Sequence, residues 1–133
     1  MATTFLIVTN NPAVVARFAN YPQCQRANYL QVLLAVRDEI HQGKRLLMHP
    51  ESGSVKPGQT PYRSLLLECG SMRLDMTSLE MIENALTRYC HYSGTGKPLS
   101  AWSDGLLRDF QLIDLSLIRQ AVEACDKGEL LRE

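Results

Sequence analysis

The sequence lacks both a net charge and a long apolar run. Its 133 residues include 14 Lys plus Arg and 14 Asp plus Glu, so the formal net charge at neutral pH is zero. Without a basic excess, the chain has no electrostatic field that would gather nucleic acid or an anionic membrane surface. We therefore expect neither nucleic acid nor a membrane among its partners.

The apolar run near the N-terminus extends only from Phe5 to Val8. A membrane helix needs about 20 apolar residues, so this run is far too short to cross a bilayer. No Lys or Arg precedes it and no small-residue cleavage site follows it, so the pattern does not fit a signal peptide. The sequence thus predicts a cytoplasmic protein.

Cysteines are few and scattered. The four are Cys24, Cys69, Cys90 and Cys125, and no two of them are closely spaced. Structural zinc sites are normally built from closely spaced pairs of ligands. We expect no metal and no disulfide, and we expect free thiols that are buried or half-buried, because free Cys is among the most buried residue types.

Known cofactor and catalytic motifs are also missing. The chain has neither the phosphate-binding G-x-x-x-x-G-K-[ST] pattern nor a G-x-G-x-x-G segment after its first apolar run. It has no G-x-S-x-G nucleophile motif, and no two carboxylates stand out as an acid–base pair. We expect no cofactor, and the sequence leaves open whether the protein is an enzyme.

The chain does have clear secondary-structure patterning. Short apolar runs predict three strands, at residues 5–8, 45–48 and 64–69. Apolar residues at helical spacing predict helices at residues 12–19 and 28–42. A third helix should begin at the capping box that starts with Thr77. A short helix from about Ser100, with Leu106 buried, and a last helix capped by Asp114 or Ser116 should follow. The prediction is a single α/β domain over residues 1–133, with a small sheet of about three strands, at least one parallel pair and four to five flanking helices.

The order of these elements also predicts strand directions. Helices connect the first strand to the second, and a helical crossover favours a parallel pair with a right-handed connection. No helix lies between the second and third strands, so the third strand is free to be antiparallel. Its direction is left open by the sequence.

The longest segment without periodicity is the loop from His49 to Arg63. A loop of this length in a small domain is usually either functional or disordered. Three prolines, Val55 and Tyr62 favour an ordered loop. Its other side chains include several hydroxyls, one imidazole, the two cations Lys56 and Arg63, and a single carboxylate, a mixture that suits an anionic or carboxylate-bearing ligand.

A second polar segment follows the first predicted strand, and the two segments point to one site. If the first two strands are parallel, both polar segments leave from the same edge of the sheet, where ligands of open α/β sheets bind. A helix that begins at Pro12 would add free backbone N–H groups there. We predict a small anionic-ligand site made by Thr9, Asn10, Asn11, His49, Ser52, Gly53, Ser54, Lys56, Thr60 and Arg63.

Each part of this site also has a purely structural explanation. Asn11 before Pro12 is a good helix cap. Pro57 and Gly58 are typical of a type II turn. On this alternative, His49 is a structural histidine, and the two cations of the loop tie it to the body of the protein.

The sequence resembles one known family, GrdX, the small proteins encoded with the glycine, sarcosine and betaine reductase components of anaerobic, amino-acid-fermenting bacteria. The similar segments are Val8–Pro12, Leu34–Gly43, His49–Pro57, Thr60–Tyr62 and Asp109–Ile118. The His49–Pro57 segment is the most specific of them. The resemblance implies a cytoplasmic accessory role beside selenium-dependent reductases that yield acetyl phosphate. It brings no established activity and no catalytic residues that could be transferred to this chain.

Three functional hypotheses follow. The preferred one is a non-catalytic accessory or regulatory protein with a small anionic ligand bound by the two polar segments. The second is an enzyme that acts on a phosphorylated or carboxylated metabolite at the same place, with His49 as general acid or base and Lys56 and Arg63 as anion clamps. The third is a scaffold that binds a reductase subunit through the His49 loop. The oligomeric state is left open, a homo-oligomer included.

Overall fold

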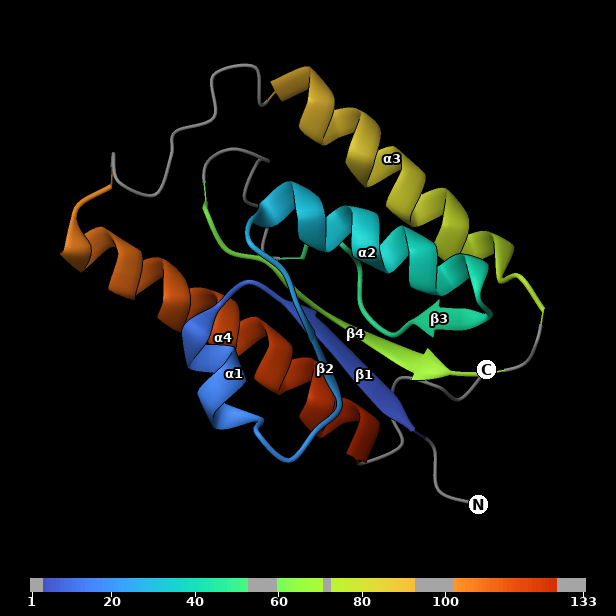
Figure 1. Ribbon diagram of the computed structural model, residues 1–133, viewed down its shortest axis with the longest axis horizontal. Coiled ribbons are helices and arrows are strands. Elements are labelled where there is room, and N and C mark those ends of the chain that lie inside the picture. Colours follow the sequence, from blue (N-terminus) through green and yellow to red (C-terminus); the bar gives the residue numbers. More distant parts are fainter. Residues whose placement is uncertain (1–3, 53–59, 71–72, 93–101, 127–133) are drawn as a thin grey trace.

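The computed structural model describes residues 4–52, 60–70, 73–92 and 102–126. The described residues form the strands β1 (Phe5–Thr9), β2 (Gln23–Gln25), β3 (Lys44–Leu46) and β4 (Ser64–Cys69), and the helices α1 (Pro12–Arg17), α2 (Tyr29–His41), α3 (Met76–Tyr92) and α4 (Asp104–Asp126). Figure 1 shows these elements in one mixed arrangement of sheet and helices. The predicted α/β class is confirmed.

The described strands make one sheet with the order β2-β1-β4-β3. β1 pairs with β2 in the parallel sense, and β4 is antiparallel to both β1 and β3. A parallel pair is present, as predicted, but it is made by β1 and β2. The strand whose direction was left open, β4, is antiparallel to its neighbours. The two strands predicted to be parallel, now β1 and β3, do run in the same direction, but β4 lies between them.

β2 is the strand that the sequence prediction missed. Its three residues, Gln23–Gln25, follow Pro22 and show no apolar alternation, so the sequence pattern predicts no strand there. Their extended conformation depends on β1, because Ile7 N donates to Pro22 O at 3.0 Å and Arg26 N donates to Thr9 O at 3.0 Å. This edge strand is a product of tertiary contact, and the sheet has four described strands rather than about three.

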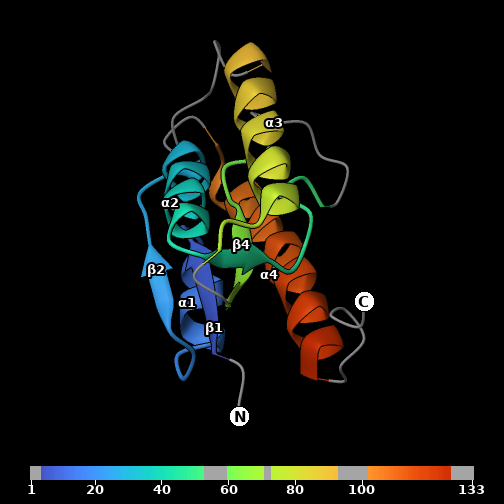
Figure 2. The same cartoon turned by 90° about the vertical axis from the view of Figure 1, so that its right-hand side faces the viewer.

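Alternating side chains along the central strands give the sheet two apolar faces. Val8 and Leu65 face α2, whereas Ile7 and Leu66 face α1 and α4. Figure 2 shows α2 and α4 on opposite sides of the sheet, with α3 packed beside α2. All four of these strand residues are 0% exposed, as expected for strands covered on both faces.

Helix α2 begins and ends close to where the sequence predicts. The Asn28 side chain caps it by accepting a hydrogen bond from Gln31 N at 2.9 Å. After the helix, the chain turns at Gly43, whose φ of 103° is readily adopted only by glycine. The apolar stripe of α2, made by Tyr29, Leu33, Val36 and Ile40, is buried, as the helical spacing of these apolar residues favours.

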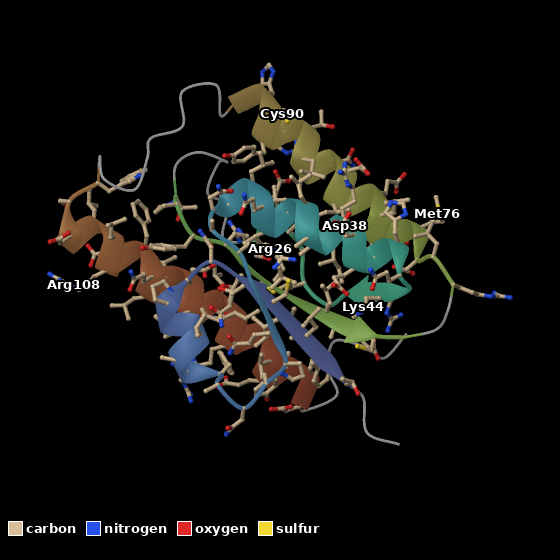
Figure 3. The ribbon with its side chains drawn as sticks, in the orientation of Figure 1. Arg26, Asp38, Lys44, Met76, Cys90 and Arg108 are labelled. Carbon is tan, nitrogen blue, oxygen red and sulfur yellow. The ribbon has the colours of Figure 1, made fainter. Side chains whose placement is uncertain are left out.

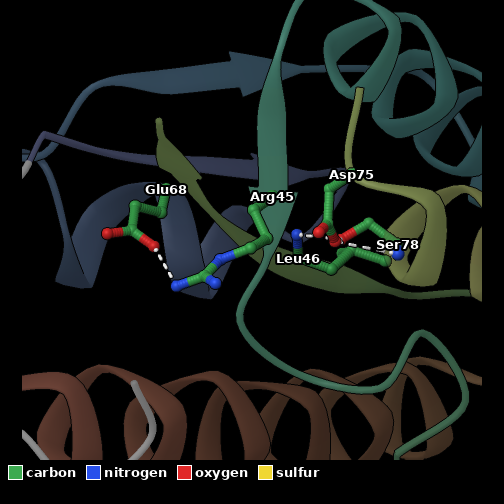
Figure 4. A network of polar contacts seen from close by, with 5 residues as sticks. All are labelled: Arg45, Leu46, Glu68, Asp75 and Ser78. Atoms are coloured by element: carbon green, nitrogen blue, oxygen red, sulfur yellow. Dashed lines mark hydrogen bonds and ion pairs between the residues drawn. The ribbon is translucent and has the colours of Figure 1, made fainter. Parts of the chain in front are cut away.

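The cap of α3 differs from the prediction. Asp75, rather than Thr77, caps this helix: its Oδ2 accepts hydrogen bonds from Ser78 N at 3.0 Å and from Ser78 Oγ at 2.6 Å. Ser78 Oγ in turn accepts a hydrogen bond from Leu46 N at 2.9 Å (Figure 4). The predicted cap was wrong because Ser78 points inward and bonds the edge of β3. This contact with another element, rather than the local sequence pattern, fixes where the helix begins.

The last described segment, residues 102–126, contains one helix rather than parts of two. α4 runs for 23 residues, and Asp114, predicted to cap a last helix, lies in its middle and is 4% exposed. Leu106, predicted to be buried, is 47% exposed. The break predicted at Asp114 is absent because Asp114 faces the sheet and finds polar partners there.

Two of the four thiols are more accessible than predicted. Cys24 is half-buried and Cys125 is buried, but Cys69 and Cys90 are exposed. Figure 3 labels Cys90 near the C-terminal end of α3. Burial is also the main cause that raises the pKa of the Cys125 thiol above its ordinary value, so this cysteine stays protonated at neutral pH.

Candidate functional site

The candidate site lies at the edge of the sheet where β1 ends and β4 begins. Antiparallel pairing places Thr9 opposite Ser64, so the polar residues after β1 meet the end of the long loop before β4. Asn10 joins them on both sides: its Nδ2 donates to Pro61 O at 2.8 Å, and its Oδ1 accepts from Arg63 N at 2.9 Å. The structure thus brings two of the predicted segments together.

Arg63 occupies the centre of this junction and is 2% exposed. Its Nη1 donates to Ser52 O at 3.0 Å, and its guanidinium carbon lies 5.5 Å from the centre of the Tyr29 ring. The buried Nε has no hydrogen-bond partner. No carboxylate of the described residues lies within 4.0 Å of this guanidinium.

An aromatic stack supports the guanidinium. Tyr29 of α2 stacks on Tyr89 of α3 with the ring centres 5.3 Å apart. Burial raises the pKa of the Tyr29 phenol above its ordinary value of 10.0, Arg63 partly offsets this rise, and Glu51 and Asp114 add to it. The phenol is therefore neutral at physiological pH, and Arg63 makes a cation–π contact with the Tyr29 ring.

A buried carboxylate, Asp114 of α4, holds the backbone of the junction. Asp114 Oδ1 accepts from Ser64 N at 3.0 Å, and Oδ2 accepts from Ser64 Oγ at 2.6 Å and from Asn11 Nδ2 at 3.0 Å. The Ser64 hydroxyl also lies 2.6 Å from Thr9 Oγ1, which accepts from Asn11 N at 2.9 Å. These bonds join β1, β4 and α4 at one point.

Thr9 and Asn11 therefore support the site from within. Both are 0% exposed, and the hydrogen bonds that they make are internal. Asn11 Oδ1 accepts from Ala13 N at 3.0 Å, and Asn11 O accepts from Val14 N at 3.1 Å, so these donors of the first turn of α1 are taken. The expectation that α1 offers free N–H groups to a ligand was wrong for Ala13 and Val14, because Asn11 caps them while it packs against α4.

The start of the long loop forms a compact turn. Ser52 donates to His49 O through both its N, at 3.1 Å, and its Oγ, at 2.7 Å. His49 is exposed, and its Nδ1 accepts from Glu51 N at 3.0 Å. At the other end of the loop, Thr60 is buried and its Oγ1 accepts from Tyr62 N at 3.4 Å. Gly53, Ser54 and Lys56 lie outside the described residues.

Sequence reasoning overlooked three residues of this region: Tyr29, Gln111 and Asp114. Gln111 Nε2 donates to the Tyr62 hydroxyl at 2.9 Å, and Gln111 O accepts from Asn11 Nδ2 at 3.0 Å. One signal was present in the sequence. Asp114 lies four residues before Ile118, on the apolar face of α4, and an acidic residue on such a face indicates a buried polar partner.

Two further surface features lie near the His49 turn and on α4: a pocket and a group of exposed apolar residues. A pocket of about 270 Å³ is lined by Leu47, Met48, His49, Ser52, Leu117, Gln120, Ala121 and Ala124. On the same helix, Leu106, Leu112 and Ile113 are exposed.

In the part of the chain that the structure describes, no group of three or more His, Cys, Asp or Glu side chains is placed to hold a metal ion. None of the described helices combines the length and the apolar character that crossing a membrane requires.

Comparison with known proteins gives one match. No curated protein and no solved structure is similar to the chain. A family model described as GrdX-like protein matches residues 6–123, which include most of β1 and most of α4. The match covers most of the chain, so this protein belongs to the GrdX-like family.

Proposed function

We propose that this protein is an accessory or regulatory component of glycine reductase and betaine reductase systems, and that it binds a small anionic ligand at the junction of β1 and β4. Membership in the GrdX-like family associates it with glycine reductase systems. The ligand site is the part of the proposal that rests on this chain's own residues. Binding at such a site would let the protein respond to a metabolite without transforming it.

One observation carries the ligand site: Arg63 is a buried cation without a carboxylate partner among the described residues. A buried charge is normally paired, because removal from water costs several kcal/mol that only a partner charge and hydrogen bonds recover. Here Ser52 O and the Tyr29 ring provide part of that compensation, and Nε has none. A small anion would supply the opposite charge that the described residues lack at this position.

The other residues of the predicted site have different roles in this proposal. Asn10, Ser52 and Thr60 position the two segments around Arg63. Thr9 and Asn11 fix the backbone beneath them. Lys56 stays a sequence-based prediction of a second cation. His49 makes no hydrogen bond or ion pair with Arg63, so the geometry lends no support to the enzyme alternative.

The test is ligand-dependent thermal stabilisation of the purified protein. We expect at least one of formate, acetate, phosphate and sulfate, at matched ionic strength with chloride as reference, to raise Tm, because a ligand that binds the folded state stabilises it by mass action. Arg63→Met, which keeps the apolar stem and removes the charge, should abolish the rise. Arg108→Met is the matched control, because Arg108 is exposed and its side chain points away from the body in Figure 3. An equal rise in the Arg63 variant would refute the site.

A second candidate function, a scaffold for a reductase component, is favoured by the exposed apolar residues of α4. Leu106, Leu112 and Ile113 present unpaired apolar surface on one helix, and surfaces of this kind are typical of protein interfaces. Co-purification of the protein with purified reductase components would test it. Binding that is lost in Ile113→Glu and kept in Arg63→Met would favour the scaffold over the ligand site, whereas absence of binding by the wild type would exclude it.

A further inference from the structure

The guanidinium of Arg63 has one occupied edge and one open edge. Nη1 is bonded to Ser52 O at 3.0 Å. Nε is buried without a partner, and Nη1 makes the one hydrogen bond from the guanidinium to a described residue that is 3.5 Å or shorter. The Tyr29 phenol also lies near the guanidinium, because a hydrogen bond with Arg63 is among the causes that lower its pKa. Nε and Nη2 point their N–H groups in nearly the same direction, so the open edge offers two parallel donors.

Two acidic side chains, Asp114 and Glu51, raise the pKa of Tyr29 and so lie in the neighbourhood of the guanidinium. Both already have other partners. Asp114 is saturated by Ser64 and Asn11. Glu51 forms an ion pair with Arg88 of α3, with Nε and Oε2 2.7 Å apart. Neither carboxylate bonds Arg63, so no acidic side chain of the described residues occupies the open edge.

The geometry and charge of this edge select among anions. Two parallel N–H donors fit the two oxygens of a carboxylate, which form a planar bidentate pair with the guanidinium. A phosphate carries about −1.5 to −2 charges near neutral pH and is normally held by more than one cation. The described part of the site supplies one buried cation, and its neighbours Tyr62 and Thr60 are also buried, which leaves little room.

We propose that the Nε–Nη2 edge of Arg63 binds a small monocarboxylate side-on, with the Tyr29 ring beneath the guanidinium and Ser52 O fixing its orientation. This inference rests on the proposed anion site and names the ligand class for it. Arginine is required at this position because lysine has a point charge and no pair of parallel donors. Specificity for a small carboxylate then follows from burial of the site and from the single buried cation among its described residues.

The most direct test observes the Arg63 side chain itself by NMR. In a ¹H–¹⁵N spectrum of the wild type, the Arg63 Nε–H resonance should be identified by its loss in Arg63→Lys and then titrated with formate and with acetate. We expect a saturable downfield shift of the Nε proton, because this proton gains a charge-assisted hydrogen bond. Inorganic phosphate at equal ionic strength should leave the resonance in place.

A matched pair of variants tests the geometry. Arg63→Lys keeps the charge, and we expect it to weaken formate binding at least tenfold, whereas Arg108→Lys should bind formate like the wild type. If Arg63→Lys does not fold, the wild-type titration decides alone. Saturable binding of phosphate without any response to formate or acetate would overturn the carboxylate assignment and leave the anion site standing. No response to any anion would refute both, and equal formate affinity in Arg63→Lys would refute the side-on clamp.

Discussion

At the scale of single residues, Asp114 has the largest structural role in the candidate site. A carboxylate in the middle of a helix is usually exposed, but this one is 4% exposed and accepts three hydrogen bonds. Its donors come from the residue that begins β4 and from the cap of α1. The same side chain therefore sets the register of α4 against the sheet and the position of the residue next to Arg63.

Asp114→Ala should lower the free energy of unfolding by about 2–4 kcal/mol, because it leaves Ser64 N without an acceptor and removes one of the two acceptors of Asn11 Nδ2, and each unsatisfied buried donor costs about 1–3 kcal/mol. Urea unfolding at neutral pH would measure the change. Asp109→Ala on the same helix is the control, because Asp109 is exposed and should change stability by less than about 0.5 kcal/mol. Equal losses in the two variants would contradict the proposed role of Asp114.

Tyr29 predicts a pH dependence at the alkaline end. Its pKa in the folded protein is raised above 10.0, mainly by burial, so the unfolded chain releases this proton first as the pH rises. The phenol's contribution to stability is therefore fully present below pH 10.0 and is lost as the pH rises through the folded pKa. Tyr29→Phe should lose less stability than the wild type between pH 9 and pH 11, measured by urea unfolding. Parallel curves for the two proteins would show that Tyr29 does not titrate differently on folding.

At the scale of elements, the start of α3 and the edge of β3 are one unit. Ser78 accepts from Leu46 N and donates to Asp75, so the helix cap also satisfies an outward-facing N–H of an edge strand (Figure 4). On the paired side of β3, Arg45 Nη2 lies 3.0 Å from Glu68 Oε1 of β4. That cross-strand ion pair is partly exposed and should contribute at most about 1 kcal/mol.

Asp75→Ala should destabilise the protein by about 0.5–2 kcal/mol, the usual cost of removing a helix cap. Thr77→Ala is the informative control, since Thr77 is the cap that the sequence pattern predicts and it is exposed in the structure. We expect that variant to stay within about 0.5 kcal/mol of the wild type. Thermal unfolding of both proteins would decide between the two caps, and a larger loss for Thr77→Ala would reverse the assignment.

At the scale of the whole molecule, β1 and β4 form the shared centre of two cores. Each contributes residues to the core under α2 and α3 and to the core under α1 and α4. β2 and β3 lie at the edges of the sheet, and each is three residues long. The candidate site lies at one end of the two central strands, so its support comes from the best-packed part of the protein.

This arrangement predicts an uneven pattern of amide hydrogen exchange. The amides of Leu65–Leu67 in β4 should exchange at least on the order of a hundredfold more slowly than those of Gln23–Gln25 in β2, because exchange in the centre requires opening of both cores. Exchange measured by NMR at neutral pH would test this. Equal protection in β2 would mean that the edge strand unfolds only together with the centre.

Much of the fold could be predicted because local patterns agree with the tertiary structure at many positions. The stripe of Tyr29, Leu33, Val36 and Ile40, the Asn28 cap and the buried runs of β1 and β4 can each be predicted from a few neighbouring residues. The two polar segments could be assigned to one edge of the sheet because strand direction alone fixes where a chain leaves the sheet. The element types, the α/β class and the neighbourhood of Asn10 and Arg63 are therefore determined by the sequence itself.

Only the tertiary structure decided which polar groups find partners. β2 is extended because β1 bonds it, α3 begins at Asp75 because Ser78 reaches the edge of β3, and α4 continues through Asp114 because Ser64 and Asn11 receive that carboxylate. Arg63 is the contrasting case: it is buried, and no side chain of the described residues is placed to neutralise its charge. The periodicity of a helix or strand depends on neighbours along the chain. The partners of a buried polar group can be far apart in the sequence: Arg63 and Ser52 are 11 positions apart, and Asn11 and Asp114 are 103 positions apart.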